Sequence, residues 1–184
     1  FASRVNFVTL EDLYLQGWNV GINLEYTWYS KIDNVYTINT STSLRLLGQS
    51  VNTSVVNSYL IANAGNRSVE LSVDAGHRGE GLTITNSLLA SGSNAVYSNG
   101  FLDLSIVGCT CDLLTGIAFD LTGVDNFVFD SPWVYSANRA FDINDVGSPV
   151  DTGTSIKVGL ATVTGNDDVI YIGSGNKGVH VHDS

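Results

Sequence analysis

Apolar and polar residues recur along this chain with a period of about 22 residues. Six turn-forming residues mark the repeat at successive intervals of 22, 23, 29, 22 and 22: Asp12, Asn34, Asn57, Asn86, Gly108 and Asp130. An aliphatic residue precedes each of these by two positions: Leu10, Ile32, Val55, Ile84, Ile106 and Val128. The chain therefore reads as a series of copies of one short unit.

Each unit has the pattern of short strands separated by turns. A second apolar pair follows the turn residue after a polar stretch, as in Val20 with Ile22 and Phe141 with Ile143. The strands alternate with a period of two, while Asn, Asp, Gly and Ser gather at the bends. Such a small unit cannot bury its apolar side chains alone, so the copies must stack and share a core. The pattern predicts an all-β, single-stranded parallel β-helix of about seven to eight coils, with the six aliphatic residues in one buried column.

Two departures from the period predict where the solenoid changes. The 29-residue interval carries about seven extra residues around 66–81, which we expect to form a surface loop. The repeat is clear over residues 1–146 and becomes blurred after them. We expect residues 147–184 to form the last coils or a C-terminal cap of the same domain.

The charge of the chain excludes some classes of partner. Eight Lys and Arg oppose eighteen Asp and Glu, which gives a net charge of −10 without any basic patch. Such a surface repels nucleic acid, and no apolar stretch approaches the length of a membrane span, so we expect neither nucleic-acid binding nor membrane insertion. The sequence suggests no cofactor and no metal site. Cys109 and Cys111, two apart on one strand, are expected to be buried free thiols.

The chain resembles the right-handed β-helix tailspikes and tail fibres of bacteriophages and, more distantly, the pectin-lyase-like superfamily. The resemblance rests on the coil length, the turn composition, the shortage of Lys and three segments: VVNSYLIANAG, LTITNSLLASGSNAVYSN and LDLSIVGCTCDLLTGIAFDL. It covers roughly residues 5 to 145, and no catalytic motif of the family is matched. The resemblance implies an extracellular virion protein, a homotrimer attached to other tail proteins, that binds and often cleaves a bacterial surface polysaccharide.

Two aromatic groups are candidates for carbohydrate binding. Trp28 and Tyr29 lie beside acidic residues, and Trp133 and Tyr135 follow Phe127 and Phe129. Flat rings flanked by carboxylates and amides suit the apolar faces and polar rims of sugars. The alternative is that these rings fill the core or a contact between subunits. Trp28 and Tyr29 are adjacent in the chain, so they cannot both point inward.

Three carboxylates are candidates for catalysis. In the 22-residue alignment Asp103 and Asp125 fall on adjacent coils, about 4.8 Å apart, with Glu80 just before the equivalent position of the preceding coil. A pair of carboxylates at such a separation provides the nucleophile and the acid/base of a retaining glycosidase. The alternative is that these aspartates only form turns.

Three functions of different class follow from these observations. The first is a segment of a phage tailspike or tail fibre that recognises a polysaccharide during host attachment. The second is a polysaccharide depolymerase, either a glycoside hydrolase or a lyase. The third is an extracellular bacterial β-helix adhesin. The binding segment is the interpretation that the residues favour, because no catalytic motif is matched.

Overall fold

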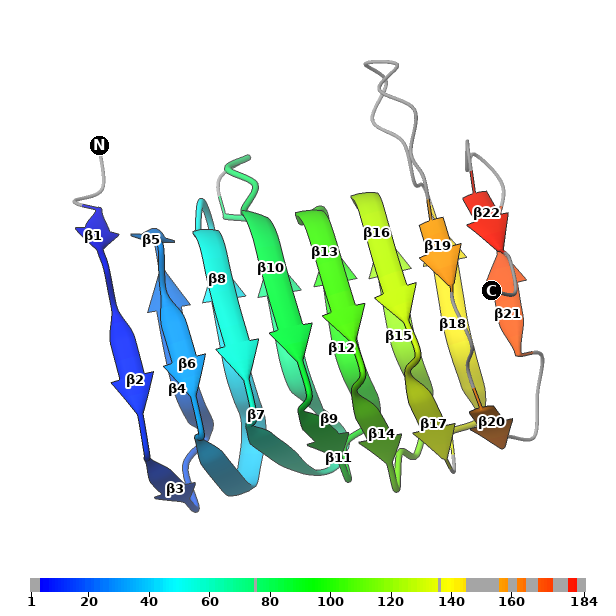
Figure 1. Cartoon of the computed structure of the whole chain (residues 1–184), viewed down its shortest axis with the longest axis horizontal. Helices are drawn as coiled ribbons and strands as arrows, with labels where there is room; N and C mark the ends of the chain where they lie inside the picture. The colour runs from blue at the N-terminus through cyan, green and yellow to red at the C-terminus, as the bar shows by residue number, and fades with distance from the viewer. Residues whose placement is uncertain are drawn as a thin grey trace.

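The fold is built only from strands and turns, without a helix, in the part of the chain that the structure describes. That structure is a computed structural model, and it describes residues 4–74, 76–135, 137–144, 156–158, 162–164, 169–173 and 179–181. The strands stack side by side along one long axis, from β1 at one end to β22 at the other (Figure 1). Every pairing between these strands is parallel, so the molecule is a parallel β-solenoid.

One sheet forms the first face of the solenoid and contributes one strand position per coil. Its ten strands are β1 (Val5–Asn6), β2 (Thr9–Glu11), β5 (Thr27–Trp28), β6 (Lys31–Asp33), β8 (Val51–Val56), β10 (Glu80–Thr85), β13 (Leu102–Val107), β16 (Asp125–Asp130), β19 (Ile156–Val158) and β22 (Val179–Val181).

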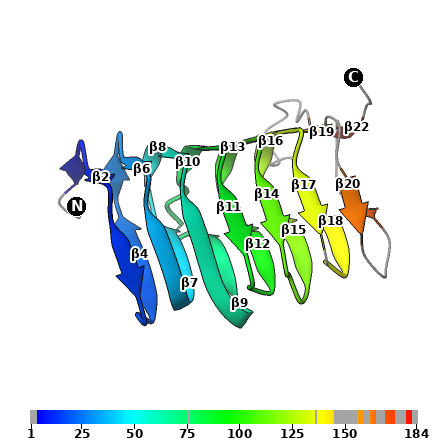
Figure 2. The same cartoon turned by 60° about the horizontal axis from the view of Figure 1, so that its bottom comes forward.

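The second sheet bends and so forms two further faces, because β7 (Tyr36–Leu47) and β9 (Tyr59–Ser72) are long strands shared by both (Figure 2). The second face is completed by β3 (Tyr14–Gln16), β11 (Leu88–Ala90), β14 (Thr110–Asp112), β17 (Trp133–Tyr135) and β20 (Thr162–Thr164). The third face is completed by β4 (Val20–Glu25), β12 (Asn94–Asn99), β15 (Ile117–Thr122), β18 (Arg139–Asn144) and β21 (Ile170–Ile172).

The solenoid has about six turns, slightly fewer than the seven to eight coils expected from the repeat. Within residues 147–184 the structure describes strands β19 to β22, which extend the same sheets in parallel. The remaining residues of this C-terminal region lie outside the described part, so its interpretation as coils or cap stays a prediction.

The buried column on the first face follows the predicted alignment for five of its six members. Leu10, Ile32, Val55, Ile84 and Ile106 are register partners on successive coils. The sixth position was predicted wrongly: Ile106 pairs with Phe129, which is fully buried, while Val128 is 39% exposed. One extra residue explains the slip, because Ala90 pairs with Asp112 but Asn94 pairs with Ile117. A shift of one residue moves every later side chain to the opposite side of the sheet.

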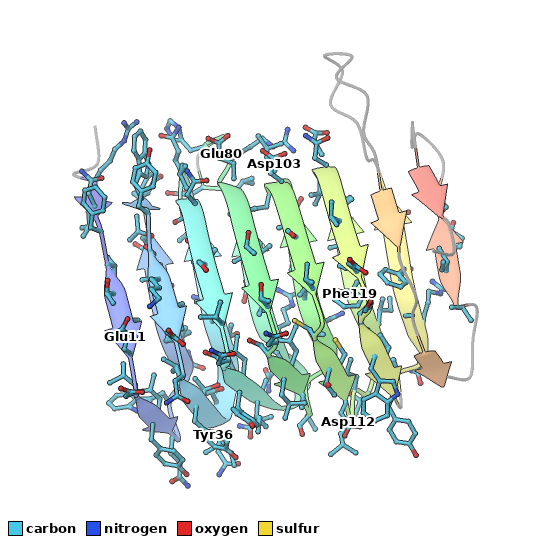
Figure 3. All side chains as sticks on the ribbon, in the orientation of Figure 1. Glu11, Tyr36, Glu80, Asp103, Asp112 and Phe119 are labelled. Carbon is cyan, nitrogen blue, oxygen red and sulfur yellow. The ribbon has the colours of Figure 1, made fainter. Side chains whose placement is uncertain are left out.

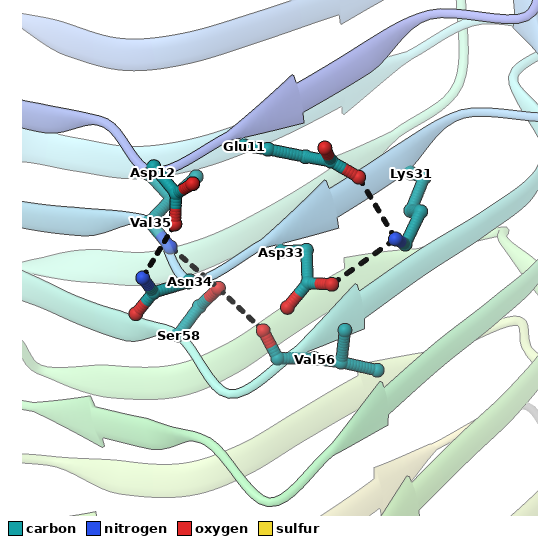
Figure 4. A network of polar contacts seen from close by, with 8 residues as sticks. All are labelled: Glu11, Asp12, Lys31, Asp33, Asn34, Val35, Val56 and Ser58. Carbon is teal, nitrogen blue, oxygen red and sulfur yellow. Dashed lines mark hydrogen bonds and ion pairs between the residues drawn. The ribbon is translucent and has the colours of Figure 1, made fainter.

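The first corner, between the first and second faces, repeats one local device. Its exposed turn residues have left-handed backbone angles, with φ between 49° and 59°: Asp12, Asn34, Asn57, Asn86, Gly108 and, after the slip, Ser131 in place of Asp130 at 52°. Asn and Gly tolerate this conformation better than other residues. Asn34 also donates from Nδ2 to Asp12 Oδ1 on the neighbouring coil, at 2.7 Å (Figure 4).

Buried hydroxyls satisfy the backbone on the inner side of the first corner. The Ser58 hydroxyl accepts a hydrogen bond from the Val35 N–H at 3.1 Å and donates to the Val56 carbonyl at 2.8 Å (Figure 4). Ser87 repeats this arrangement for the Ser58 N–H and the Thr85 carbonyl. Cys109 takes the next position, where its thiol contacts the Val107 carbonyl. Each coil therefore caps the backbone of its neighbour.

The third corner, between the third and first faces, contains the predicted insertion. Its loop includes an isolated antiparallel bridge between Asp74 and His77. Arg78 reaches from this loop to the two following coils, where it donates to the carbonyl oxygens of Gly100 and Gly123 and pairs with Asp125. In the other direction the Tyr26 hydroxyl donates to Asp74 at 2.5 Å. The insertion thus ties together several coils along one edge.

Candidate functional site

The predicted catalytic carboxylates do not form the expected facing pair. Asp103 has Asn126 as its neighbour, and Asn126 Nδ2 donates to Asp103 Oδ1 at 2.8 Å. Asp125 has Leu102 as its register partner, so the expected alignment of Asp103 with Asp125 is wrong by one residue. Glu80, exposed at the start of β10, pairs with Val51 and Leu102. Glu80 and Asp103 both lie at the upper edge of the solenoid in Figure 3.

Asp125 is buried, and its surroundings favour a structural role. Its carboxylate lies 3.4 Å from Arg78 Nη1, and the same guanidinium binds two turn carbonyls. Asp103, in contrast, is exposed on the outer side of the first face. The two carboxylates therefore point to different environments, although they belong to adjacent coils. The sequence could not reveal the Arg78 contact, because its partner lies 47 residues away.

Of the first aromatic group, Tyr29 is exposed and Trp28 is partly covered. The ring of Tyr29 stacks on Phe7 with centroids 5.6 Å apart. Trp28 lies beneath the guanidinium of Arg4, which is 4.3 Å from its ring centroid. The expectation that one of the two adjacent rings must lie outside the core is confirmed.

The second aromatic group divides between core and surface. Phe127 and Phe129 are fully buried and pack against Phe119 and Phe141. Trp133 and Tyr135, on β17 of the second face, are exposed and stack with centroids 5.6 Å apart. Only these two members of the group are accessible to a ligand.

A third group of aromatic residues, which the sequence interpretation missed, lies on the same face as Trp133. Tyr14, Tyr36 and Tyr59 are register partners on three adjacent coils, with ring centroids 5.3 and 5.5 Å apart. Tyr36 is labelled at the lower edge of Figure 3. Their spacing of 22 and 23 residues is the spacing of the repeat itself, so this signal was present in the sequence. We call these three residues the tyrosine stack.

A surface hollow begins where the tyrosine stack ends. The coils after Tyr59 carry Leu88 and Thr110 at the equivalent position, and Trp133 follows Thr110. The hollow has a volume of about 410 Å³ and is lined by Tyr59, Asn86, Ser87, Leu88, Gly108 and Thr110. Gly108 keeps it open, because a Cβ at that position would lie 3.0 Å from Asn86 Oδ1. We call it the Tyr59 hollow.

The Tyr59 hollow combines an aromatic wall with polar groups at its rim. Tyr59 is 49% exposed and ends the stack, so the side of its ring away from Tyr36 faces the hollow. Within the described residues, neither the Asn86 carboxamide nor the Thr110 hydroxyl has a hydrogen-bond partner. Both groups are therefore free to bind a ligand.

The third face carries a pair of aspartates on adjacent coils. Asp120 and Asp142 are register partners. Burial and the Asp142 carboxylate raise the pKa of Asp120 above its ordinary value, while Arg67 acts in the opposite direction. Asp142 accepts hydrogen bonds from Arg139 at 2.5 Å and Asn144 at 2.6 Å. This is the facing carboxylate pair that the alignment had placed, wrongly, at Asp103 and Asp125.

Comparison with known proteins leaves the fold as the class of this protein, a parallel β-solenoid. No family model matches the chain, and no curated protein or solved structure matches it significantly. Among the described residues there is no group of three or more potential metal ligands of the His, Cys, Asp or Glu type. The described part also contains no helix long and apolar enough to cross a membrane. Cys109 and Cys111 are buried free thiols, as the sequence predicts.

Proposed function

We propose that this chain is a glycan-binding solenoid segment that recognises a bacterial surface polysaccharide, as do the phage tailspikes and tail fibres that its sequence resembles. The observation that carries the proposal is the Tyr59 hollow, an open site beside an exposed aromatic ring. Its volume of about 410 Å³ falls in the range of ligand sites. The assignment to a virion and the attachment to other tail proteins rest on the resemblance alone.

The chemistry of the hollow suits a sugar ring. The free side of Tyr59 can stack against the apolar C–H face of a pyranose, and Leu88 extends this apolar surface. Asn86 and Thr110 place amide and hydroxyl groups where the hydroxyls of the sugar would lie. Because the coils repeat along the axis, Trp133 offers a second exposed ring beyond Thr110 for a longer glycan chain.

Removal of the aromatic wall tests the proposal. We expect Tyr59→Ala to weaken binding to purified capsular polysaccharide or O-antigen by about tenfold or more, since buried aromatic contacts often contribute over 1.4 kcal/mol. The measurement is binding to an array of immobilised bacterial polysaccharides, followed by titration calorimetry with the glycan that binds.

Tyr14→Ala provides the matched control, because Tyr14 is also an exposed tyrosine of the stack but lies two coils from the hollow. We expect this variant to bind as the unmodified protein does. Equal losses in both variants, or an array on which no polysaccharide is retained, would contradict the proposal.

Cleavage of the polysaccharide is a second candidate function, favoured by Asp120 and Asp142. Neighbouring carboxylates of which one has a raised pKa are the pair that acid/base hydrolysis requires. If the chain cleaves its glycan, Asp120→Asn abolishes the release of new reducing ends, whereas Asp103→Asn leaves it intact. Absence of new reducing ends from a polysaccharide that the unmodified protein binds would reject this candidate.

A parallel homotrimer is the assembly that we propose for the segment. The first face exposes the stacked rings of Phe7 and Tyr29, which are 76% and 51% accessible. Association of three copies would cover such apolar surface. Light scattering measures the mass directly, and a stable monomer at micromolar concentration would contradict the trimer without affecting the glycan proposal.

A further inference from the structure

A second cleft lies at the other end of β7 and β9 from the Tyr59 hollow, on the third face. Its volume is about 410 Å³, and its lining is polar: Asn19, Thr42, Arg45, Asn66, Arg67 and Glu70 line it, among others. Two of the five arginines of this acidic chain meet here. We call it the arginine cleft.

The two arginines share one carboxylate. Arg45 Nη2 lies 3.5 Å from Glu70 Oε2, and Arg67 Nη1 lies 3.4 Å from Glu70 Oε1. The local balance is therefore two positive charges against one negative charge. The next carboxylate along this face is that of Asp120, whose pKa Arg67 lowers in opposition to burial and Asp142.

Glu70 leaves most of the guanidinium donors unused. Its contacts with Arg45 and Arg67 are ion pairs without hydrogen-bond geometry. Its oxygens instead accept hydrogen bonds from the hydroxyls of Thr42 and Ser72, both at 3.4 Å. Each guanidinium carries five N–H donors. Both arginine side chains are about one-third accessible, at 33% and 34%, so these donors can reach a ligand in the cleft.

Neighbouring groups hold the arginines in place before any ligand binds. The guanidinium carbon of Arg67 lies 3.5 Å from the centroid of the Tyr97 ring, which fixes the plane of this guanidinium. Arg45 and Arg67 start from adjacent strands of the rigid third face. Arginine forks at fixed positions are the usual means of binding carboxylate, sulfate or phosphate groups through paired hydrogen bonds.

We infer that the arginine cleft binds one oxyanionic group of a sugar ligand, a carboxylate, sulfate or phosphate, between Arg45 and Arg67. Asn19 and Asn66 then lie at the rim, where their amides can bind the hydroxyls of the sugar ring. The inference is independent of the Tyr59 hollow, because the two sites share no residue.

Titration with simple ligands tests the inference and identifies the oxyanion. Glucuronate, glucose 6-sulfate and glucose 6-phosphate are compared with neutral glucose by calorimetry and by NMR of the arginine side chains. We expect at least one charged sugar to bind and glucose not to bind. The charged sugar that binds most tightly identifies the oxyanion. If no charged sugar binds better than glucose, the inference is wrong.

Two variants distinguish a binding site from a structural ion pair. Arg45→Gln should weaken binding of the charged sugar by about tenfold or more, because it removes one guanidinium fork. Arg4→Gln, which removes the same charge near Trp28, should leave it unchanged. Glu70→Gln removes the competing carboxylate and should strengthen binding severalfold.

The Glu70→Gln variant is the sharpest of these tests, since a purely structural network would only lose stability. Unchanged or weaker binding in that variant, measured under conditions where circular dichroism shows it folded, would overturn the inference. Equal binding by Arg45→Gln and the unmodified protein would overturn it as well. Neither outcome affects the glycan proposal for the Tyr59 hollow, which the Tyr59→Ala and Tyr14→Ala pair tests separately.

Discussion

The first and third corners of the solenoid meet the same requirement in different ways. At both corners the chain turns and leaves backbone groups without strand partners. The first corner satisfies them locally, with one Asn and one buried Ser or Cys per coil. The third corner satisfies two turn carbonyls with a single guanidinium, that of Arg78, which comes from a loop two coils away. The comparison teaches that repeated, local contacts distribute stability, whereas a long-range contact concentrates it in one residue.

The largest expected effect is at the third corner. We expect Arg78→Met to lower the free energy of unfolding by about 2–4 kcal/mol, because two carbonyls and the buried Asp125 lose their charged partner. Denaturant unfolding followed by circular dichroism measures the change. Lys31→Met, which breaks exposed ion pairs with Glu11 and Asp33, serves as the control and should cost at most about 1 kcal/mol. Equal losses in the two variants would remove the distinction between the corners.

A smaller effect is expected at the first corner. Ser58→Val leaves the buried N–H of Val35 without an acceptor, which should cost about 1–3 kcal/mol. Ser58→Cys should cost less, because Cys109 already occupies the equivalent position on a later coil. Unfolding of the two variants under identical conditions checks the order. A cysteine variant that is less stable than the valine variant would contradict the capping role of the Ser58 side chain.

The exposed side of the first corner should be less sensitive still. Asn57 has a φ of 51°, so Asn57→Ala places a β-carbon in a conformation that costs about 1 kcal/mol or more. Asn57→Gly should be nearly neutral, because glycine adopts this conformation without steric strain. Thermal unfolding of the pair tests the point. If alanine and glycine behaved alike, backbone conformation would not be the reason for asparagine at this position.

The smallest effect is a pH dependence at the third corner. The hydrogen bond to Asp74 is the main cause that raises the pKa of Tyr26 above its ordinary value. The unfolded chain therefore loses this proton first, so the stabilisation is present below pH 10 and declines as the pH rises above it. Tyr26→Phe should be slightly less stable than the unmodified protein at neutral pH, and the difference should shrink at higher pH. A constant difference between pH 8 and pH 11 would exclude this linkage.

The sequence was sufficient for the architecture because its signals are local and repeated. Asn34, Asn57 and Asn86 mark the left-handed turns, and the aliphatic residues two positions before them mark the buried column. The tyrosine stack follows the same period and could have been found in the same way. Each of these signals depends on a residue type that one conformation or one environment favours.

The sequence was not sufficient where the period fails or where contacts are long-range. In the segment from Phe127 to Phe129 three apolar residues follow one another, and Asp130 happens to lie 22 residues after Gly108. The slip by one residue was therefore invisible, and it exchanged Val128 for Phe129 and aligned Asp125 with Asp103. The pairing of Arg78 with Asp125 has no local pattern at all. The hollow beside Tyr59 depends on which small side chains follow the ring, which only correct registration reveals.

The insertion also gives the solenoid a means to avoid misassembly. Coils of nearly equal length can in principle pair one step out of place, because similar apolar side chains would still meet in the core. Arg78 would then lose the carbonyls of Gly100 and Gly123, and Tyr26 would lose Asp74. An alignment displaced by one coil thus costs several specific interactions at once. The one irregular coil acts as a key that selects a single order of stacking during folding.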